Sequence, residues 1–425
     1  MPYPLCRLCG AELTHTFVDL GMSPPCESYL AAEQLDQGET FYPLHVRVCP
    51  QCLLVQLPSY IPAEDIFTDY AYFSSYSDSW VKHAEAFVEK AIEKRSLRPA
   101  DGPEGSGSFV IEVASNDGYL LQHTVARGIR SLGIEPAANV AAAAVDKGID
   151  TEVAFLGQET GTKIAETYGA ADLVVANNVF AHVPDIVDFA KGLRALVADD
   201  GVVTIEIPHL LRLIAGNEFD TIYHEHFSYL SLLTTQRVLA TAGLTVVDVE
   251  ELPSHGGSLR TWSVPTERVT AGFETPSGNL TKVLAEEERA GLHTLAGHAG
   301  FAQAVERVRN ALVDFLIQCD REGSLVAAYG APGKGNTLLN YCGIRSDLLL
   351  FTVDRNPIKH GKFLPGTHIP IHAEEALREA RPDYVLIMPW NLRKEIATQL
   401  SYVHDWGGRL VVALPHLEIL EGAHR

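Results

Sequence analysis

The stretch from Phe109 to Leu121, FVIEVASNDGYLL, limits the possible folds more than any other part of the chain. Its first five residues are mostly apolar and predict a short strand buried in a parallel sheet. The polar turn Ala114–Gly118 follows, and Tyr119 then opens a helix whose first N–H groups face that turn. Gly118 tolerates positive φ and would let a ligand approach the backbone. The pattern predicts a doubly wound α/β fold with a ligand at the carboxyl ends of its strands.

The residues around this turn favour one class of ligand. Glu135 ends the next short apolar run, where a carboxylate can accept hydrogen bonds from a ribose. The turn is not G-x-G-x-x-G and has no P-loop lysine, which favours S-adenosylmethionine over NAD or ATP. The alternative is an ordinary strand–turn–helix unit that binds nothing. The expected cofactor-binding residues are Glu112, Ala114, Asn116, Asp117, Gly118 and Glu135, together with Asn177 and Asn178 at the end of a later strand.

Composition excludes several classes of function. The 425 residues suffice for two or three domains, and the formal net charge of −21 argues against binding to nucleic acids or anionic membranes. No apolar run reaches the roughly 18 residues of a membrane span, and the first residues do not form a signal pattern. We therefore expect a cytoplasmic protein.

Two C-x-x-C pairs, Cys6/Cys9 and Cys49/Cys52, open the chain. Four thiolates close a tetrahedral Zn²⁺ shell without an open position, so the predicted zinc is structural. The segment between the pairs is rich in turns, and a metal explains how it folds. The remaining cysteines, Cys26, Cys319 and Cys342, are interpreted as packing residues.

An aromatic stretch, Ile66 to Trp80, precedes a helix that we expect to run through Lys94, with Ser77 or Asp78 as its N-cap. Its aromatic residues can be core or can form a lid over a polar site. The connector from Asp101 to Ser108 is rich in Gly and Ser and marks a boundary.

The most unusual polar cluster is Tyr223-His224-Glu225-His226. Two histidines around a carboxylate near a ligand crevice favour a catalytic role, and the absence of H-E-x-x-H argues against a zincin-type metal site. His and Tyr side chains suit proton abstraction and stabilisation of the oxyanion that results. Downstream, His255-Gly256-Gly257 indicates a close approach of backbone, and the following strand carries Arg260.

A second α/β unit begins near Leu325. Its turn Gly330–Thr337 contains Lys334 and Asn336 and precedes a helix, which makes it a candidate anion site. The basic segment after Asp354 adds His360 and Lys362, and we expect these four residues and Arg260 to bind a diphosphate-containing substrate. Either the turn is merely the relic of a duplicated nucleotide fold, or the spacing from Lys334 to Asp354 marks a dinucleotide half-site, which keeps a dehydrogenase open.

These motifs, in this order, resemble the sugar C-methyltransferases that act on nucleotide-linked 4-keto deoxyhexoses in natural-product pathways. The resemblance covers nearly the whole chain. It implies a zinc-binding domain (1–65), an S-adenosylmethionine-binding Rossmann-like domain (66–270, with 66–100 as an aromatic and helical lid) and a C-terminal Rossmann-like α/β domain (271–425) that binds the nucleotide-sugar. The family's active-site pattern carries over to Tyr76, His182, Tyr223, Glu225 and His226.

The resemblance also implies a reaction. His226, with Glu225 orienting it or buffering its charge, would remove a proton beside the 4-keto group of a dTDP-sugar. Tyr223 and His182 would stabilise the oxyanion, and Tyr76 would close over the sugar. C-3 is the expected methylation site, with C-5 as the alternative. The rival readings are an NAD-dependent nucleotide-sugar oxidoreductase or epimerase and a zinc adaptor without catalysis. Both a monomer and a homodimer remain open.

Overall fold

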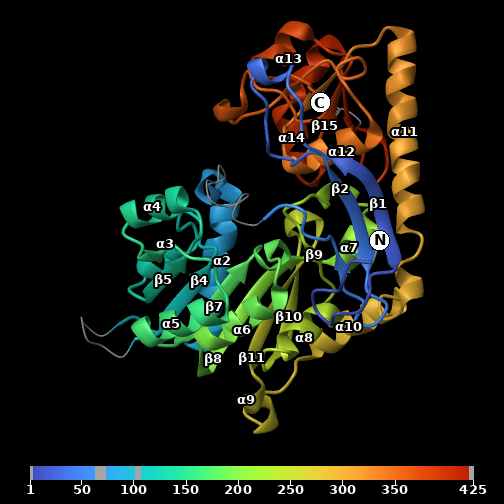
Figure 1. The fold of residues 1–425 in the computed structure, drawn as a ribbon. Helices are drawn as coiled ribbons and strands as arrows, with labels where there is room; N and C mark the ends of the chain where they lie inside the picture. Colours follow the sequence, from blue (N-terminus) through green and yellow to red (C-terminus); the bar gives the residue numbers. More distant parts are fainter. Residues whose placement is uncertain (1–2, 63–72, 101–106, 421–425) are drawn as a thin grey trace.

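The computed structural model describes residues 3–62, 73–100 and 107–420. Three sheets organise this part of the chain, and each lies in a different region of the molecule (Figure 1). None of the helices in the described ranges combines the length and the apolar composition that crossing a bilayer requires. The predicted α/β class is confirmed.

The N-terminal sheet has four antiparallel strands in the order β1–β2–β3–β9. Its bounds are β1 (His15–Ser23), β2 (Tyr42–Val48), β3 (Val55–Gln56) and β9 (Ser228–Tyr229). The fourth strand comes from the middle of the chain, since Tyr229 pairs with Val55. The Tyr223–His226 segment, which directly precedes β9, is thereby tied to the N-terminal region.

The central sheet has seven strands in the order β10–β11–β8–β7–β4–β5–β6. The bounds are β4 (Phe109–Val113), β5 (Arg130–Ile134), β6 (Thr151–Glu152), β7 (Ala171–Asn177), β8 (Val197–Pro208), β10 (Leu244–Leu252) and β11 (Ser258–Pro265). The five neighbouring strands β8, β7, β4, β5 and β6 are parallel to one another, and β11 is antiparallel to both of its neighbours. Every residue of β4 is buried, as its apolar sequence predicts. The turn after β4 lies where the strand order reverses, the usual ligand position in such sheets.

Helices cover both faces of the central sheet (Figure 1). Their bounds are α2 (Asp78–Arg95), α3 (Leu121–Val125), α4 (Ala138–Asp146), α5 (Gln158–Tyr168), α6 (Ile186–Leu196), α7 (Leu210–Ala215), α8 (Leu232–Ala240), α9 (Thr266–Thr270) and α10 (Gly278–Arg289). Ser77 caps α2 by accepting a hydrogen bond from the Trp80 N–H, which confirms one of the two expected caps. The buried face of α2 holds Ala84, Phe87, Val88 and Ala91.

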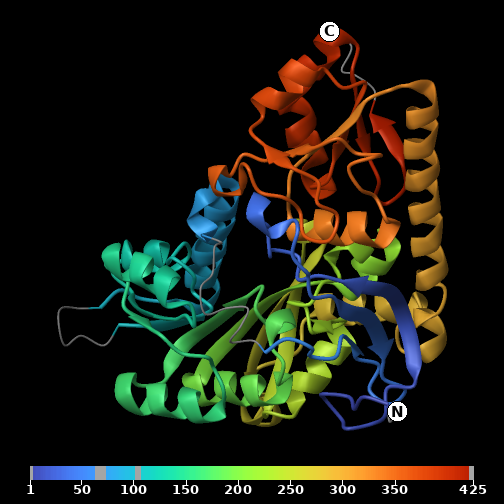
Figure 2. The ribbon, with the colours of Figure 1, turned by 45° about the horizontal axis from the view of Figure 1, so that its top comes forward.

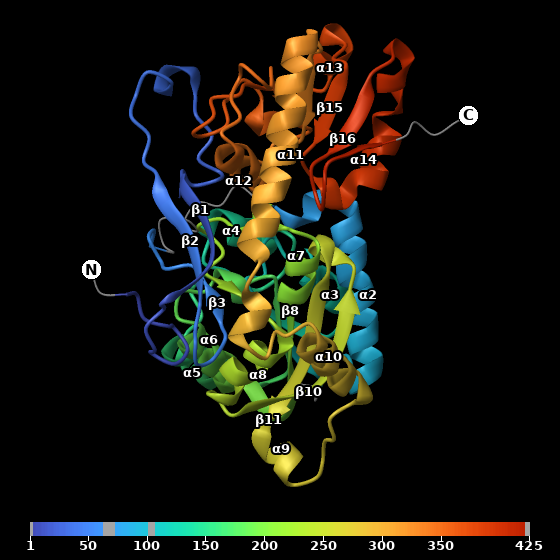
Figure 3. The same ribbon diagram turned by 90° about the vertical axis from the view of Figure 1, so that its right-hand side faces the viewer.

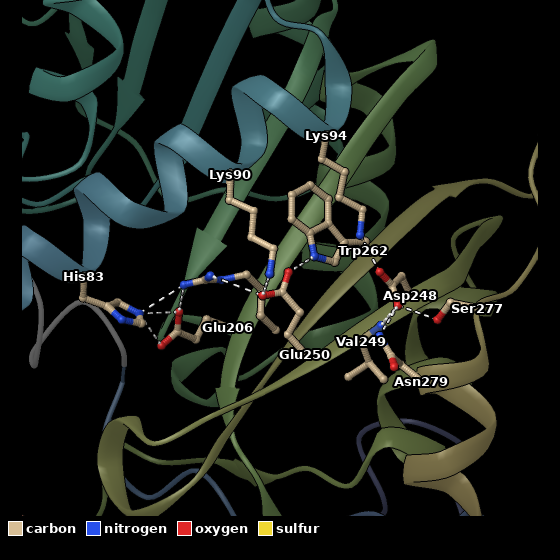
Figure 4. Close-up of polar contacts among 11 residues, drawn as sticks. His83, Lys90, Lys94, Glu206, Asp248, Val249, Glu250, Trp262, Ser277 and Asn279 are labelled. Atoms are coloured by element: carbon tan, nitrogen blue, oxygen red, sulfur yellow. Dashed lines mark hydrogen bonds and ion pairs between the residues drawn. The ribbon is translucent and has the colours of Figure 1, made fainter.

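Charged side chains fasten α2 to the central sheet. His83 binds Glu206 of β8 at 2.9 Å, Lys90 pairs with Glu250 of β10 at 2.6 Å, and Lys94 pairs with Asp248 of the same strand (Figure 4). These contacts follow one side of the helix, because positions seven and four residues apart share a face.

The C-terminal sheet has six strands in the order β14–β13–β12–β15–β16–β17, parallel except for β17. Its strands are β12 (Val326–Tyr329), β13 (Thr352–Val353), β14 (Ile371–His372), β15 (Tyr384–Ile387), β16 (Arg409–Val412) and β17 (Glu418–Leu420). Its helices are α11 (Phe301–Glu322), α12 (Gly333–Cys342), α13 (Glu375–Ala380) and α14 (Arg393–Gln399). The long helix α11 stands between the N-terminal strands and the C-terminal sheet (Figure 3), and one apolar core joins all three.

Short 3-10 helices connect these elements: η1 (Ala32–Gln34), η2 (Ser74–Tyr76), η3 (Phe180–His182), η4 (Phe219–Thr221), η5 (Ser254–Gly256), η6 (Leu295–His298), η7 (Pro357–Lys359), η8 (Trp390–Leu392) and η9 (Ser401–Trp406).

The three regions interlock rather than follow one another as separate bodies. The N-terminal segment around η1 reaches the C-terminal region, where Leu30 bridges to Phe363 and Glu39 binds His368, and Figures 1 and 2 both show the blue N-terminal sheet beside the orange α11. Helix α10, inside the range 271–425, packs on β10 and α8 of the central sheet. The expected boundary at 65/66 and most of the aromatic stretch lie outside the described residues.

Candidate active site

A cavity of about 650 Å³ opens where the three regions meet. The N-terminal region contributes Cys26 and Glu27 to its wall, and the C-terminal region contributes Pro332, Gly333 and Lys334. The central region supplies the rest, including residues that follow β4, β5, β7 and β8. The size is that of a pocket for small molecules, and the lining combines apolar walls with polar and charged side chains.

The turn after β4 forms one end of this cavity. Ala114 and Asn116 both have positive φ, 55° and 50°, a strained conformation that non-glycine residues rarely adopt. The Glu135 carboxylate supports the turn by accepting hydrogen bonds from the N–H groups of Asn116 and Ala137, each at 2.9 Å. Ala114, Asn116 and Glu135 line the cavity as predicted for cofactor-binding residues.

Three other expected cofactor residues, in β4 and in the turn itself, are not among the described residues of the cavity wall. Glu112 is buried within β4, and this burial raises the pKa of its carboxyl group. Asp117 pairs with Lys147 at 2.9 Å. A Cβ on Gly118 would lie 2.2 Å from Cδ1 of Ile149, so this glycine makes room for a packed side chain and not for a ligand.

The two asparagines after β7 fit a ligand-binding role. Asn177 and Asn178 line the cavity, and Asn178 is held at a φ of 53° by its N–H donating to the Glu206 carbonyl at 2.8 Å. Within the described part of the chain, the buried Oδ1 of Asn177 and both polar side-chain atoms of Asn178 have no hydrogen-bond partner. Buried polar atoms are normally paired, so these atoms are suited to a polar ligand such as the methyl donor.

Three rings of the predicted catalytic set lie together on the wall of the same cavity. The ring of His226 is 4.0 Å from that of Tyr223 and 4.6 Å from that of His182, measured between centroids. Nδ1 of His226 donates to the Thr221 carbonyl at 2.7 Å, which leaves the lone pair on Nε2. Burial lowers the pKa of His226 well below its ordinary value and that of His182 to about 4. A neutral His226 can accept a proton.

Glu225 also lies on the cavity wall, but of its two expected roles the structure does not show the orienting one. The Thr221 carbonyl, and not the Glu225 carboxylate, orients the His226 ring. Glu225 instead accepts a hydrogen bond from the Cys26 thiol at 3.5 Å, and burial together with the nearby Glu27 raises its pKa to about 7. Cys26, interpreted from sequence as a packing residue, is therefore part of the site.

Tyr76 lies apart from the other four residues of the predicted catalytic set. It is 79% exposed and stacks on Phe73 with ring centroids 5.4 Å apart. The reason is local: the Ser74 N–H donates to Asn116 at 2.8 Å and the Ser75 N–H to Asp117, which lays η2 over the cofactor turn with Tyr76 facing outward.

Of the five expected substrate-binding residues, the structure places only Lys334 on the cavity wall. Asn336 is fully buried in α12, and His360 binds the Asp354 carbonyl at 2.7 Å while Lys362 lies nearby in the same loop. Arg260 is buried and pairs with Glu206 at 2.6 Å, so its charge stabilises the attachment of α2. The sequence showed the right residue types. It did not show which of these side chains would be paired with other groups of the protein and so be unavailable to the substrate.

The four predicted zinc ligands come together at the other end of the N-terminal sheet. The Sγ atoms of Cys6, Cys9, Cys49 and Cys52 all lie within 4.8 Å of one another. A tetrahedral shell with Zn–S bonds of about 2.3 Å places its sulfurs about 3.8 Å apart, which this cluster accommodates. Both knuckles turn in the same way, since the N–H groups of Gly10 and Leu53, each at positive φ, donate to the carbonyls of Cys6 and Cys49.

Comparison with known proteins agrees with this arrangement. Three family models match successive parts of the chain: a putative zinc binding domain over residues 6–67, a methyltransferase domain over 80–249 and a C-methyltransferase C-terminal domain over 253–415. C-methyltransferase NovU from Streptomyces niveus is 36% identical over 419 residues, which are 99% of this chain and 97% of that protein. The chain belongs to this C-methyltransferase family.

Two solved methyltransferase structures match less than half of this chain. An S-adenosylmethionine-dependent methyltransferase from Clostridium acetobutylicum has 11% identity, covering 43% of this chain and 91% of that one, with a TM-score of 0.35. Magnesium protoporphyrin IX methyltransferase from Synechocystis has 13% identity, covering 46% and 86%, with a TM-score of 0.32.

The family assignment decides the class of protein. It is a C-methyltransferase that uses S-adenosylmethionine and carries zinc, which excludes both the oxidoreductase and the zinc adaptor. The donor fits the end of the cavity at Ala114, Asn116, Glu135 and the two asparagines, and the zinc fits the four cysteines.

Proposed function

We propose that the enzyme methylates C-3 of a dTDP-linked 4-keto deoxysugar, in the pathway to a branched sugar of a natural product. The observation that carries this proposal is the neutral His226, fixed through Nδ1 by Thr221, in a cavity that it shares with the cofactor turn. A C–H beside a ketone is acidic enough for such a base, because its loss gives an enolate.

The residues of the wall then have distinct tasks. Nε2 of His226 takes the proton from C-3, and the electron pair of the C–H bond moves onto the ketone oxygen. Tyr223 and His182 donate hydrogen bonds to that oxygen as its charge grows. The enolate carbon forms its new bond to the methyl group, whose bond to sulfur breaks. Lys334 meets the negative charge of the diphosphate at the C-terminal side of the cavity.

C-5 is the alternative site, because it also flanks the 4-keto group and would use the same base. Incubation of dTDP-4-keto-6-deoxyglucose with the enzyme and S-adenosylhomocysteine in D₂O separates the two. We expect deuterium to enter at C-3. Entry at C-5 instead would assign the methylation to C-5. The enolate mechanism is wrong if neither carbon exchanges and if deuterium at these carbons has no effect on the rate of methyl transfer from S-adenosylmethionine.

Two variants test the assignment of residues. We expect His226→Ala to lose the exchange together with methyl transfer. We expect Tyr223→Phe to lower kcat by about 10- to 1000-fold, the cost of one oxyanion donor. Near wild-type kcat in His226→Ala would remove His226 as the base.

A further inference from the structure

A third histidine, His255, faces the same cavity and has no role in the proposed reaction. It lies in η5 at a φ of 54°, in the left-handed region that is strained for a non-glycine residue. Gly256 and Gly257 follow, also with positive φ. Strain of this kind persists where the surroundings enforce it and concentrates at functional sites.

Neighbouring side chains hold the ring of His255 in place. Trp80 packs against it edge-on with centroids 5.2 Å apart, and Trp80 is itself stacked on His83 at 4.8 Å. His83 binds the Glu206 carboxylate from α2, as Figure 4 shows. The same carboxylate accepts a hydrogen bond from Ser254 at 2.8 Å. One buried acid thus holds both the loop that carries His255 and the helix that carries Trp80.

The ring itself is left for a ligand. Among the described residues, no hydrogen bond to either ring nitrogen of His255 is found. His255 keeps an exposed surface and lines the cavity, and desolvation by the surrounding protein, with the charge of Lys334, lowers its pKa to about 4. His255 is therefore a neutral imidazole with one N–H donor near neutral pH.

His255 shares one cavity wall with both parts of the proposed substrate site. The positive charge of Lys334, the candidate partner of the diphosphate, acts on its ring. The ring is also near enough to His182 and His226 to lower their pKa values. A substrate that reaches both His226 and Lys334 within this cavity can contact His255.

We propose that His255 is a substrate-binding residue whose N–H donates a hydrogen bond to an oxygen of the sugar-diphosphate part of the substrate, holding the sugar against His226. This inference rests on the proposed function, since it takes a nucleotide-sugar as the ligand. It assigns His255 to the substrate and not to the methyl donor.

The test uses two variants of the full-length enzyme. His255→Gly removes the ring and suits the left-handed backbone, so it folds without strain. His255→Phe keeps a ring against Trp80 but has no N–H. Isothermal titration measures the Kd of dTDP, dTDP-glucose and S-adenosylhomocysteine for each variant, and His15→Phe, on the exposed start of β1, is the matched control.

We expect both variants to bind dTDP-glucose about 10- to 100-fold more weakly, the range for losing a hydrogen bond near a charged group, with S-adenosylhomocysteine unchanged. Equal weakening for dTDP places the accepting oxygen on the diphosphate, and unchanged dTDP binding places it on the sugar. Unchanged dTDP-glucose binding, or weakened S-adenosylhomocysteine binding, overturns the assignment. A wild-type enzyme that binds neither dTDP nor dTDP-glucose overturns the proposed function first.

Discussion

The two strand–turn–helix units of this chain, β4–α3 and β12–α12, are built with the same support. In the central unit the Glu135 carboxylate accepts hydrogen bonds from the N–H group of Asn116 in the turn and from that of Ala137, two residues after the acid itself. In the C-terminal unit the Asp354 carboxylate accepts from Ala331 in the turn at 2.7 Å and from Asn356, again two residues further on, at 2.8 Å.

The units differ in what contacts the turn. The turn after β4 lines the cavity through Ala114 and Asn116, and η2 lies over part of it. The turn after β12 lines the cavity through Pro332, Gly333 and Lys334. Its Ala331 carbonyl accepts hydrogen bonds from Tyr29 and Lys359, at 2.7 Å and 2.9 Å, and Cys26 packs against Gly333. The acid that ends the second strand is therefore first of all a structural brace in both units.

The largest expected effect comes from removing the two braces. Glu135→Ala should raise the Kd of S-adenosylhomocysteine at least about 100-fold, because it removes two charge-assisted hydrogen bonds from the turn that lines the donor end of the cavity. Asp354→Ala should leave that Kd within twofold and lower the free energy of unfolding by about 1–3 kcal/mol. Calorimetry and urea unfolding of both variants measure this, and equal losses of affinity would end the distinction between the two turns.

The positive-φ glycines of the two turns give the next effect. A Cβ on Gly118 would lie 2.2 Å from Ile149, and one on Gly330 would lie 2.7 Å from Pro389. Each Gly→Ala variant should lose about 2–4 kcal/mol of stability, from overpacking and from the strained backbone.

A double variant shows whether packing is the cause. Ile149→Val deletes the Cδ1 atom that a Cβ at position 118 would meet, so Gly118→Ala with Ile149→Val should cost less than the sum of the two single variants. Full additivity would show that Gly118 serves some purpose other than making room for Ile149.

Sequence reasoning found the elements but not the partners of individual side chains. The apolar run of β4, the cap of α2 and the cysteine pairs are local signals, and the structure confirms them. Arg260 and Glu225 were misjudged because their partners, Glu206 and Cys26, lie 54 and 199 residues away. No local pattern shows which distant side chain neutralises a charge or orients a ring.

Lys334 is the charged residue that the turn after β12 contributes to the cavity wall, beside Pro332 and Gly333. Its Nζ donates to Asn391 at 3.0 Å and lies over the ring of Trp390. Lys334→Met should raise KM for the nucleotide-sugar about 10- to 30-fold, since it removes one charged contact to a diphosphate, with KM for S-adenosylmethionine unchanged. An effect on kcat alone would show that Lys334 serves the chemistry and not binding.

The smallest expected effect concerns the acids that face Lys334. Burial and the neighbouring Asp220 raise the pKa of Glu218 to about 7, although Lys334 opposes the shift. The folded protein therefore holds a proton here that the unfolded chain loses near pH 4.5, so stability falls as pH rises from about 4.5 to 7. Glu218→Gln should remove about 1–2 kcal/mol of that fall, measured by urea unfolding at pH 5 and pH 8. Part of the slope should remain, because the raised pKa values of Asp220, about 6, and Glu225, about 7, act in the same direction. An unchanged slope would mean that Glu218 stays ionised, with Lys334 as its partner rather than a ligand of the substrate.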